Sequence, residues 1–168
     1  MPKSKKKLKK QNKNILILLI AIFLINSILL IFIIENRVVI SEFANVKRVI
    51  DGDTIELNNS EKVRLSGINA AELGECFSDE AKQKLEELVL NKEIGLEKDI
   101  SNKDKYDRLL RYIYVDDIFV NGLLVKEGYV KVYDKYKNDT KRYRELKNLE
   151  KTAIKNSTGI WACQNSTS

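Results

Sequence analysis

Histidine is absent from this sequence of 168 residues, and cysteine occurs only twice. Without histidine the chain has no Ser-His or Cys-His nucleophile and no histidine base or metal ligand. Two cysteines are also too few for a structural zinc site. Among common hydrolytic designs, a site made of acidic residues, arginine and an oxygen-ligated cation remains.

The excess of positive charge is confined to the N-terminus. The chain has 30 Lys and Arg against 24 Asp and Glu, a net charge of +6. Seven lysines lie before residue 15, which leaves 23 basic and 24 acidic residues in the remainder. The remainder therefore has no general basic surface, and any polyanion would have to bind there through a local site.

The long hydrophobic run ILILLIAIFLINSILLIFII extends from Ile15 to Ile34. At about 1.5 Å per residue, a helix of this length spans roughly 30 Å, the thickness of a hydrocarbon core. No small-residue cleavage site follows Ile34, so we expect an uncleaved, single-pass membrane anchor over residues 15–34. The lysine-rich tail, residues 1–14, is expected in the cytoplasm, which places the rest of the chain outside the cell.

The rest of the chain has room for one domain with a single core. We expect a linker over residues 35–43, the domain over residues 44–163 and a tail over residues 164–168. Patterning predicts strands at 44–50, 53–57, 62–68, 93–98 and 109–115, and helices at 79–90, 121–128 and from Thr140 to about Lys155. Ser78 and Thr140 are the expected N-caps.

Residues 50–72, IDGDTIELNNSEKVRLSGINAAE, combine acidic residues, an arginine and a turn in one β-rich stretch. Asn58, Asn59 and Ser60 predict a hairpin. In a register that pairs position i with about 119 minus i, Asp53 and Arg64 lie one pair apart on the same face. The second strand then returns residues 69–72 beside the start of the first.

Carboxylate and amide oxygens beside an arginine suit a hard divalent cation and a phosphate together. Phosphodiester chemistry is therefore one interpretation of the hairpin. The other is a solvated hairpin whose charges only face water, and the spacing alone does not separate the two.

Five strings occur in order from about Asn45 to Cys163: VIDGDT, VRLSGINAAE, DKYDRLLRYIYV, NGLLVKEGYVKV and GIWAC. Together they resemble the staphylococcal nuclease-like (thermonuclease) family. The resemblance implies an α+β fold, an OB-type five-stranded β-barrel with three helices, here preceded by one transmembrane helix. It also implies calcium-dependent cleavage of DNA and RNA. We expect a monomer with no organic cofactor.

The resemblance carries the family's catalytic residues over to this sequence. The first metal aspartate falls on Asp53, and the two catalytic arginines fall on Arg64 and Arg108. The general-base glutamate falls on Glu72. All four residue types are those of the family.

The remaining site positions depart from the family pattern. The second metal carboxylate falls on Asn69, and the ligand that uses its backbone carbonyl falls on Ala70. Asn69 offers an oxygen without charge, which predicts a weaker calcium site. Ala71 replaces the usual proline before the base, and Asp107 replaces a usual glycine beside Arg108.

Cys76 and Cys163 would both lie in the outward-facing domain. A disulfide that ties the C-terminal segment to the barrel is the expected arrangement. Two free, buried thiols are the alternative.

Two functions compete for this sequence. One is a membrane-anchored, outward-facing nuclease that acts on DNA or RNA with calcium. The other is a catalytically weakened OB-fold module that binds single-stranded nucleic acid or a protein partner at the cell surface. Asn69, Ala71 and Asp107 favour the second, but Glu72 favours the nuclease, because a binding surface needs no positioned base.

Overall fold

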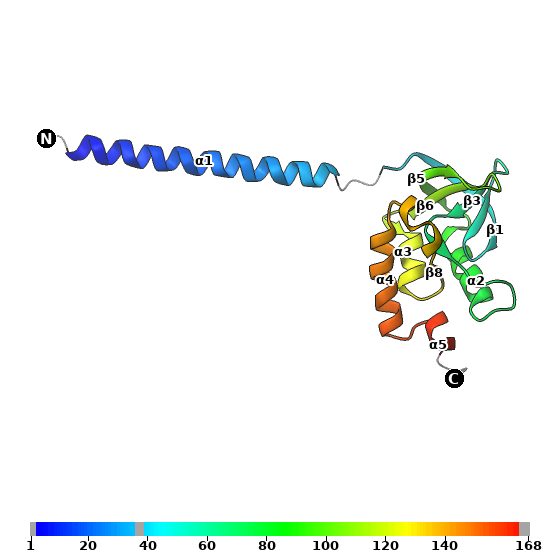
Figure 1. The fold of residues 1–168 in the computed structure, drawn as a ribbon. Coiled ribbons are helices and arrows are strands. Elements are labelled where there is room, and N and C mark those ends of the chain that lie inside the picture. Colours follow the sequence, from blue (N-terminus) through cyan, green and yellow to red (C-terminus); the bar gives the residue numbers. More distant parts are fainter. Residues whose placement is uncertain (1–2, 36–38, 165–168) are drawn as a thin grey trace. The chain divides into compact units, whose positions relative to one another are not determined.

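The computed structural model describes residues 3–35 and 39–164 (Figure 1). It divides into two compact units, with the boundary between Val39 and Ile40. The predicted linker includes residues 36–38, and the predicted tail includes residues 165–168; both ranges lie outside the described residues. The two units are described separately.

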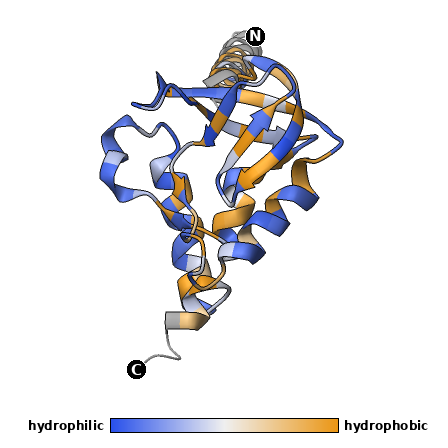
Figure 2. Ribbon diagram, turned by 90° about the vertical axis from the view of Figure 1, so that its right-hand side faces the viewer, coloured by the Kyte–Doolittle hydropathy of each residue, from blue (hydrophilic) through white to orange (hydrophobic). Residues whose placement is uncertain are grey.

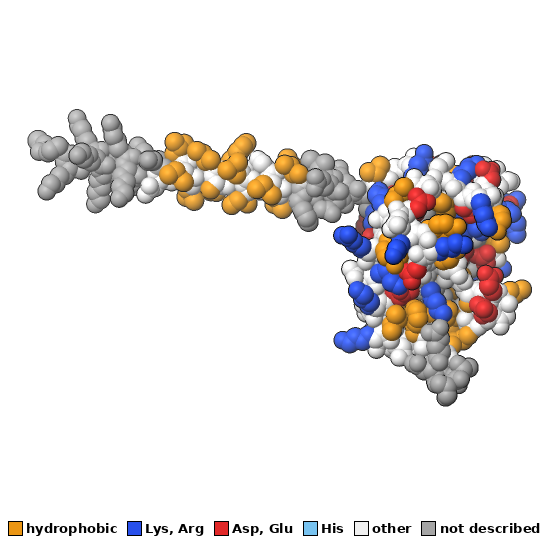
Figure 3. Space-filling model, viewed as in Figure 1, with side chains coloured by type: hydrophobic (Ala, Val, Ile, Leu, Met, Phe, Trp, Pro, Cys, Tyr) orange, Lys and Arg blue, Asp and Glu red, His pale blue; other side chains and the backbone are white. Residues whose placement is uncertain are grey.

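The first unit is a single helix, α1 (Lys3–Glu35). Its segment Asn14–Ile31 is long and apolar enough to cross a membrane. On the face that Figure 3 shows, hydrophobic side chains are spread along the described part of this segment. Asn26 and Ser27 interrupt the run. The polar hydroxyl of Ser27 is hydrogen-bonded within the helix, because it donates to the carbonyl of Phe23 at 2.9 Å.

The second unit is built on a closed barrel of five strands. The barrel strands are β1 (Glu42–Asp51), β2 (Thr54–Leu57), β3 (Lys62–Leu65), β5 (Glu93–Lys103) and β6 (Leu109–Val115). Strand β1 pairs antiparallel with β2 and β5, β2 pairs with β3, and β5 pairs with β6. A parallel pairing of β3 with β6 closes the ring. The predicted five-stranded OB-type barrel is confirmed.

Three further strands are short. Strand β7 (Ile118–Phe119) pairs with β6 and joins the barrel sheet, while β4 (Ile68–Asn69) and β8 (Lys131–Val132) pair antiparallel in a separate two-stranded sheet. Only two residues separate β3 from β4. Residues 69–72 therefore follow the barrel wall directly.

The three predicted helices of the domain are present. They are α2 (Ser78–Val89), α3 (Val120–Lys126) and α4 (Tyr143–Lys155). Helices α3 and α4 pack side by side (Figure 1). A 3₁₀ helix, η1 (Asp134–Asp139), and a short helix, α5 (Ile160–Gln164), were not predicted.

Both predicted N-caps are wrong. The residue before α2 is Phe77, which has a φ of 69° and gives no side-chain cap, while Ser78 is already helical. The Thr140 hydroxyl donates backwards to the carbonyl of Tyr136 at 2.9 Å, and α4 begins at Tyr143. Neither hydroxyl therefore satisfies an amide at the start of its helix.

The hydrophobic core lies between the barrel and the three helices. Hydrophobic and hydrophilic residues alternate along the barrel strands in Figure 2, as expected for strands with one buried face. The fully buried aliphatic side chains come from strands and helices alike: Ile55, Val63, Leu65, Leu85, Leu96, Ile113, Leu124 and Leu146. The barrel and helices therefore share one core.

The predicted hairpin register is wrong by one residue. Thr54 lies opposite Arg64, and Ile55 lies opposite Val63. The turn closes early because the amide of Ser60 donates to the carbonyl of Leu57 at 2.9 Å. The slip moves Arg64 one position along the partner strand.

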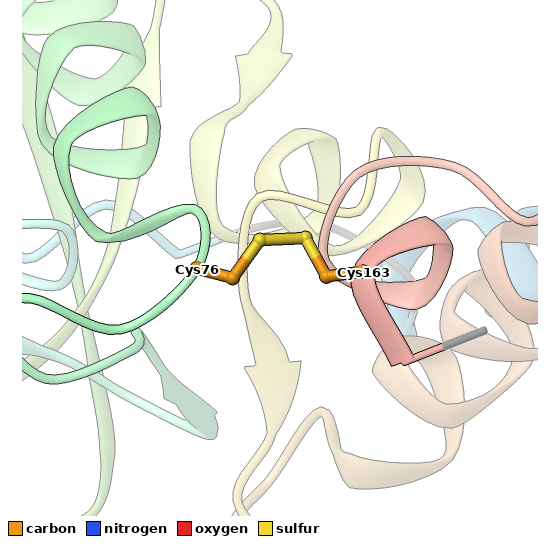
Figure 4. The surroundings of a disulfide bond; sticks show 2 residues. All are labelled: Cys76 and Cys163. Atoms are coloured by element: carbon orange, nitrogen blue, oxygen red, sulfur yellow. A yellow bond between two sulfur atoms is a disulfide. The ribbon is translucent and has the colours of Figure 1, made fainter. Parts of the chain in front are cut away.

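Cys76 and Cys163 form a disulfide with a Cα–Cα distance of 6.5 Å (Figure 4). The bond links the loop before α2 to the C-terminal helix α5. In the chain-entropy model, closing a loop of this length stabilises a domain by about 4 to 5 kcal/mol.

A buried acid holds the start of α4 against the barrel. The side chain of Glu97 in β5 is 1% exposed and accepts from Arg142, with Nη2 at 2.8 Å, and from Lys141. The Tyr114 hydroxyl also donates to Glu97, at 2.9 Å. Burial works to raise the pKa of Glu97, but these hydrogen bonds outweigh it and hold that pKa below its usual value.

We expect Glu97→Gln to lower the free energy of unfolding at pH 7 by about 1.5 to 3 kcal/mol, the size of hydrogen bonds to charged groups. Since the folded-state pKa is lowered, this stabilisation is complete above the unfolded-state pKa and is lost as pH falls through the folded one. Urea unfolding at pH 7 and at pH 3 measures it. The exposed Glu93→Gln on the same strand is the control; equal losses in the two variants would contradict the assignment.

Candidate active site

A cleft of about 740 Å³ opens on the barrel wall. It is lined by the turn between β1 and β2, by β3 and β4, by the loop before α2, by the loop between β5 and β6, and by the η1 segment. All six predicted catalytic and metal residues line this one cleft: Asp53, Arg64, Asn69, Ala70, Glu72 and Arg108. The structure therefore brings the predicted site together.

Asp53 and Arg64 form the centre of the cleft. Asp53 Oδ2 lies 3.0 Å from Arg64 Nη2, and both side chains are about nine-tenths buried. The contact survives the register slip because Asp53 lies in the turn before β2, where the strict alternation of a strand does not hold. The predicted pairing of carboxylate and guanidinium is present, although the reasoning from register was wrong.

Two further groups hold the Asp53 carboxylate. The amide of Ala70 donates to Oδ2 at 2.7 Å, and the Thr54 hydroxyl donates to Oδ1 at 3.0 Å. Burial is the main cause that raises the pKa of Asp53 to about 6, and the charge of Asp51 adds to it. Arg64 and the two hydrogen bonds oppose this rise. The carboxylate is therefore short of positive charge.

Gly52 permits the close packing behind Asp53. A Cβ at this position would lie 2.7 Å from the Cβ atoms of both Ala70 and Ala81. The turn thus lies directly on α2 and on the loop after β4, which fixes the distance from Asp53 to Ala70.

Arg64 is held on the cleft wall by two more acceptors. Its Nη1 donates to the carbonyl of Leu65 at 2.9 Å, and its Nη2 donates to Asn69 Oδ1 at 3.0 Å. Burial lowers the pKa of Arg64, and the positive charge of Arg108 adds to that lowering. A guanidinium has five N–H donors, so within the described part of the chain it keeps donors for a ligand.

Asn69 and Ala70 place neutral oxygens next to the carboxylate. The Asn69 amide nitrogen donates to the carbonyl of Ala70 at 3.1 Å. Among the described residues, no group of three acidic, cysteine or histidine side chains is placed to hold a metal. Oxygen donors near Asp53 on the cleft are thus the Asn69 side chain, the Ala70 backbone and the Asp51 carboxylate.

Arg108 reaches the cleft from the loop between β5 and β6. Its Nε and Nη2 donate to Asp104 Oδ2 at 2.8 and 2.7 Å. Burial works to raise the pKa of Asp104, but the hydrogen bonds from Arg108 outweigh it and lower that pKa. Arg108 therefore lines the cleft and is also ion-paired with an acid of its own loop.

Asp107 takes the backbone conformation of the glycine that it replaces. Its φ is 64°, in the left-handed region that aspartate tolerates better than most residues. Its carboxylate lies 2.9 Å from Lys103 Nζ and points to solvent. Its charge is therefore paired with Lys103 rather than with Arg108.

Glu72 lies on the cleft wall in an exposed loop. Its amide donates to Glu75 Oε2 at 2.9 Å, and its carbonyl accepts from the amide of Glu75 at 2.9 Å. These local bonds set the backbone conformation at Glu72, and both involve the backbone of Glu72, not its carboxylate.

Two residues with supporting roles were missed by the sequence analysis. Asn121 is fully buried, and its amide donates to the carbonyl of Ser66 at 3.0 Å while accepting from the amide of Ile113 at 2.9 Å. It locks the end of β3 to β6. Asp104, which orients Arg108, is the second; its spacing of four residues from Arg108 was the available signal.

Comparison with known proteins identifies the family of the chain. The model of the family described as "Staphylococcal nuclease homologue" matches residues 62–163. The chain is 33% identical to an uncharacterized endonuclease of Haemophilus influenzae, over 84% of this chain and 79% of the relative. It is 36% identical to a thermonuclease of Staphylococcus intermedius, over 69% of this chain and 74% of the relative.

A micrococcal nuclease of Shigella flexneri is 30% identical, over 71% of this chain and 74% of the relative. The residues that the family model matches begin at β3 and include the loop that carries Arg108 and helices α2, α3 and α4. The barrel, the cleft and these relatives together show that the chain belongs to the staphylococcal nuclease family.

Proposed function

We propose that the chain is a nuclease that hydrolyses phosphodiester bonds of DNA or RNA with a divalent cation. The observation that carries the proposal is the buried pair of Asp53 and Arg64, with Arg108 and Glu72 on the same cleft. Family membership supports the same activity, since the relatives are endonucleases and thermonucleases by name.

The residues around Asp53 fit a hard cation. Their donors are oxygens only: the Asp53 carboxylate, the Asn69 amide oxygen and the Ala70 carbonyl. The raised pKa of Asp53 supports the fit, because a nearby cation would stabilise this buried carboxylate in its charged form. When bound, a calcium ion would supply positive charge to a phosphoryl oxygen.

The two arginines bind and stabilise the phosphate in this proposal. Arg64 is fixed by the barrel, so its free N–H groups are oriented before substrate arrives. Arg108 adds a second planar donor from the opposite loop. Donors aimed at oxygens that gain charge lower the barrier most when they need no reorientation.

Glu72 is the proposed general base. Its carboxylate takes a proton from a water molecule, and the water oxygen attacks the phosphorus in line with the leaving oxygen. An exposed carboxylate on the cleft wall can meet both water and substrate.

Helix α1 is proposed as an uncleaved membrane anchor. Its apolar segment Asn14–Ile31 has the required length, and the lysines that precede it favour the cytoplasm. The nuclease domain would then face outward, where calcium is plentiful.

Glu72→Gln is expected to reduce kcat by roughly 10² to 10⁴, the range for loss of a general base, with substrate binding nearly unchanged. Cleavage of DNA and RNA in calcium and in chelator measures the rate, and binding is measured in chelator. Glu80→Gln, exposed in the first turn of α2, is the control. A Glu72→Gln enzyme as fast as wild type would favour the binding module over the nuclease.

Asn69→Asp is expected to lower the calcium concentration at half-maximal activity, because ligand charge tunes such sites. The variant also removes the amide that occupies the Ala70 carbonyl. Asn69→Ala should shift the midpoint the other way. Calorimetric titration with calcium gives a readout independent of cleavage, and Asn58→Asp in the hairpin turn is the control. An unchanged midpoint in Asn69→Asp would mean that this residue does not contact the cation.

The full chain is expected in the membrane fraction after cell lysis, with an intact N-terminus. Alkaline carbonate should leave it there, and protease added to intact cells should digest the domain while residues 1–14 stay protected. N-terminal sequencing that begins beyond Ile34 would show a cleaved signal peptide instead.

A further inference from the structure

The loop that carries Glu72 has few contacts of its own. Residues 72–76 are exposed, and the side chain of Leu73 is 91% exposed. The backbone bonds of this loop are local and join Glu72 to Glu75 and Glu75 to Ser78. Local bonds of this kind hold the shape of a loop but not its position on the barrel.

The two ends of the loop are held differently. At the first end, the Ala70 amide is bound by Asp53. At the second end, the centres of the Phe77 and Tyr129 rings are 6.0 Å apart, and Cys76 is bonded to Cys163 through a disulfide. Figure 4 shows the disulfide as a bridge between the loop and α5.

Helix α5 is firmly docked on the domain. The amide of Ile160 donates to the carbonyl of Gly128 at 2.9 Å, and the backbones are so close that a Cβ on Gly159 would lie 2.1 Å from the Gly128 oxygen. Lys131 Nζ lies 5.3 Å from the centre of the Trp161 ring. Lys131 itself pairs with Asn69 across β8 and β4, so α5 is tied to the strand that leads into the site.

We propose that the disulfide between Cys76 and Cys163 positions Glu72, by fastening the far end of its loop to α5. The proposal rests on the proposed function, in which Glu72 is the base. Asp53, Arg64 and Arg108 are held by the barrel and by their own ion pairs, so they do not depend on the bond. The cysteines are positioning residues that act on catalysis through one side chain.

If the disulfide positions only Glu72, opening it should change the rate of turnover but not the binding of substrate or cation. A small displacement of a reacting group can cost about 10²-fold in rate. Opening the bond should therefore reduce kcat by roughly 10- to 100-fold while KM and the calcium midpoint stay within about three-fold of wild type.

The test uses the full chain in detergent with Cys76→Ser, Cys163→Ser and the double variant. All three should lose kcat equally, because each opens the same bond. Dithiothreitol, which reduces the disulfide to two thiols and is oxidised to its cyclic disulfide, should produce the same loss in wild type. Reoxidation should restore the rate, and the double variant should not respond to the reagent.

Ile94→Ala is the control for lost stability. Ile94 is fully buried at the start of β5, at the opposite end of that strand from Lys103 in the cleft. All variants are assayed at temperatures where circular dichroism shows them folded. Under those conditions Ile94→Ala should keep its kcat. An equal kcat loss in Ile94→Ala and in the double cysteine variant would overturn the proposal.

The decisive measurement adds Glu72→Gln to the double cysteine variant. If the bond acts through Glu72, the combined variant should be no slower than Glu72→Gln alone. Losses that multiply would overturn the proposal, and so would a double cysteine variant with the wild-type kcat. Full activity in Glu72→Gln itself would overturn the proposed function as well, so the two failures are distinct.

Discussion

Asp53 and Arg64 form a buried ion pair whose charges both had to leave water on folding, which costs several kcal/mol for each ion. The surrounding groups offset that cost: the Ala70 amide and the Thr54 hydroxyl donate to the acid, while Leu65 and Asn69 accept from the arginine. Each of these partners lies on a different part of the hairpin or of β4. The pair therefore fixes the turn, the barrel wall and the start of the Glu72 loop at once.

Arg108 is held in a different way from Arg64, and the difference follows from the elements that carry them. Arg64 lies in a barrel strand and is about nine-tenths buried, whereas Arg108 lies in a loop and is bound to Asp104 of the same loop. A phosphate that binds Arg108 must share it with that carboxylate. One arginine is thus held by the barrel, and the other is held by an acid of its own loop.

The sequence predicted the barrel, most element positions and the shared cleft, because these depend on patterning and on strings that the family keeps together. The predicted hairpin register and both predicted N-caps were wrong. Ser78 is already helical, and the Thr140 hydroxyl donates to the carbonyl of Tyr136 instead of accepting from α4. The supporting role of Asn121 could not be predicted from the sequence. Its side chain joins Ser66 to Ile113, and these residues come together only when the barrel closes.

Asn69 has a physical consequence for the ion pair of Asp53 and Arg64. Its oxygen satisfies Arg64 without adding a charge, so the buried cluster of Asp53, Arg64 and Asn69 is neutral by itself. A carboxylate at this half-buried position would place a second negative charge beside the same guanidinium, and like charges close together destabilise each other. The amide therefore satisfies Arg64 without a second negative charge that would itself need a partner.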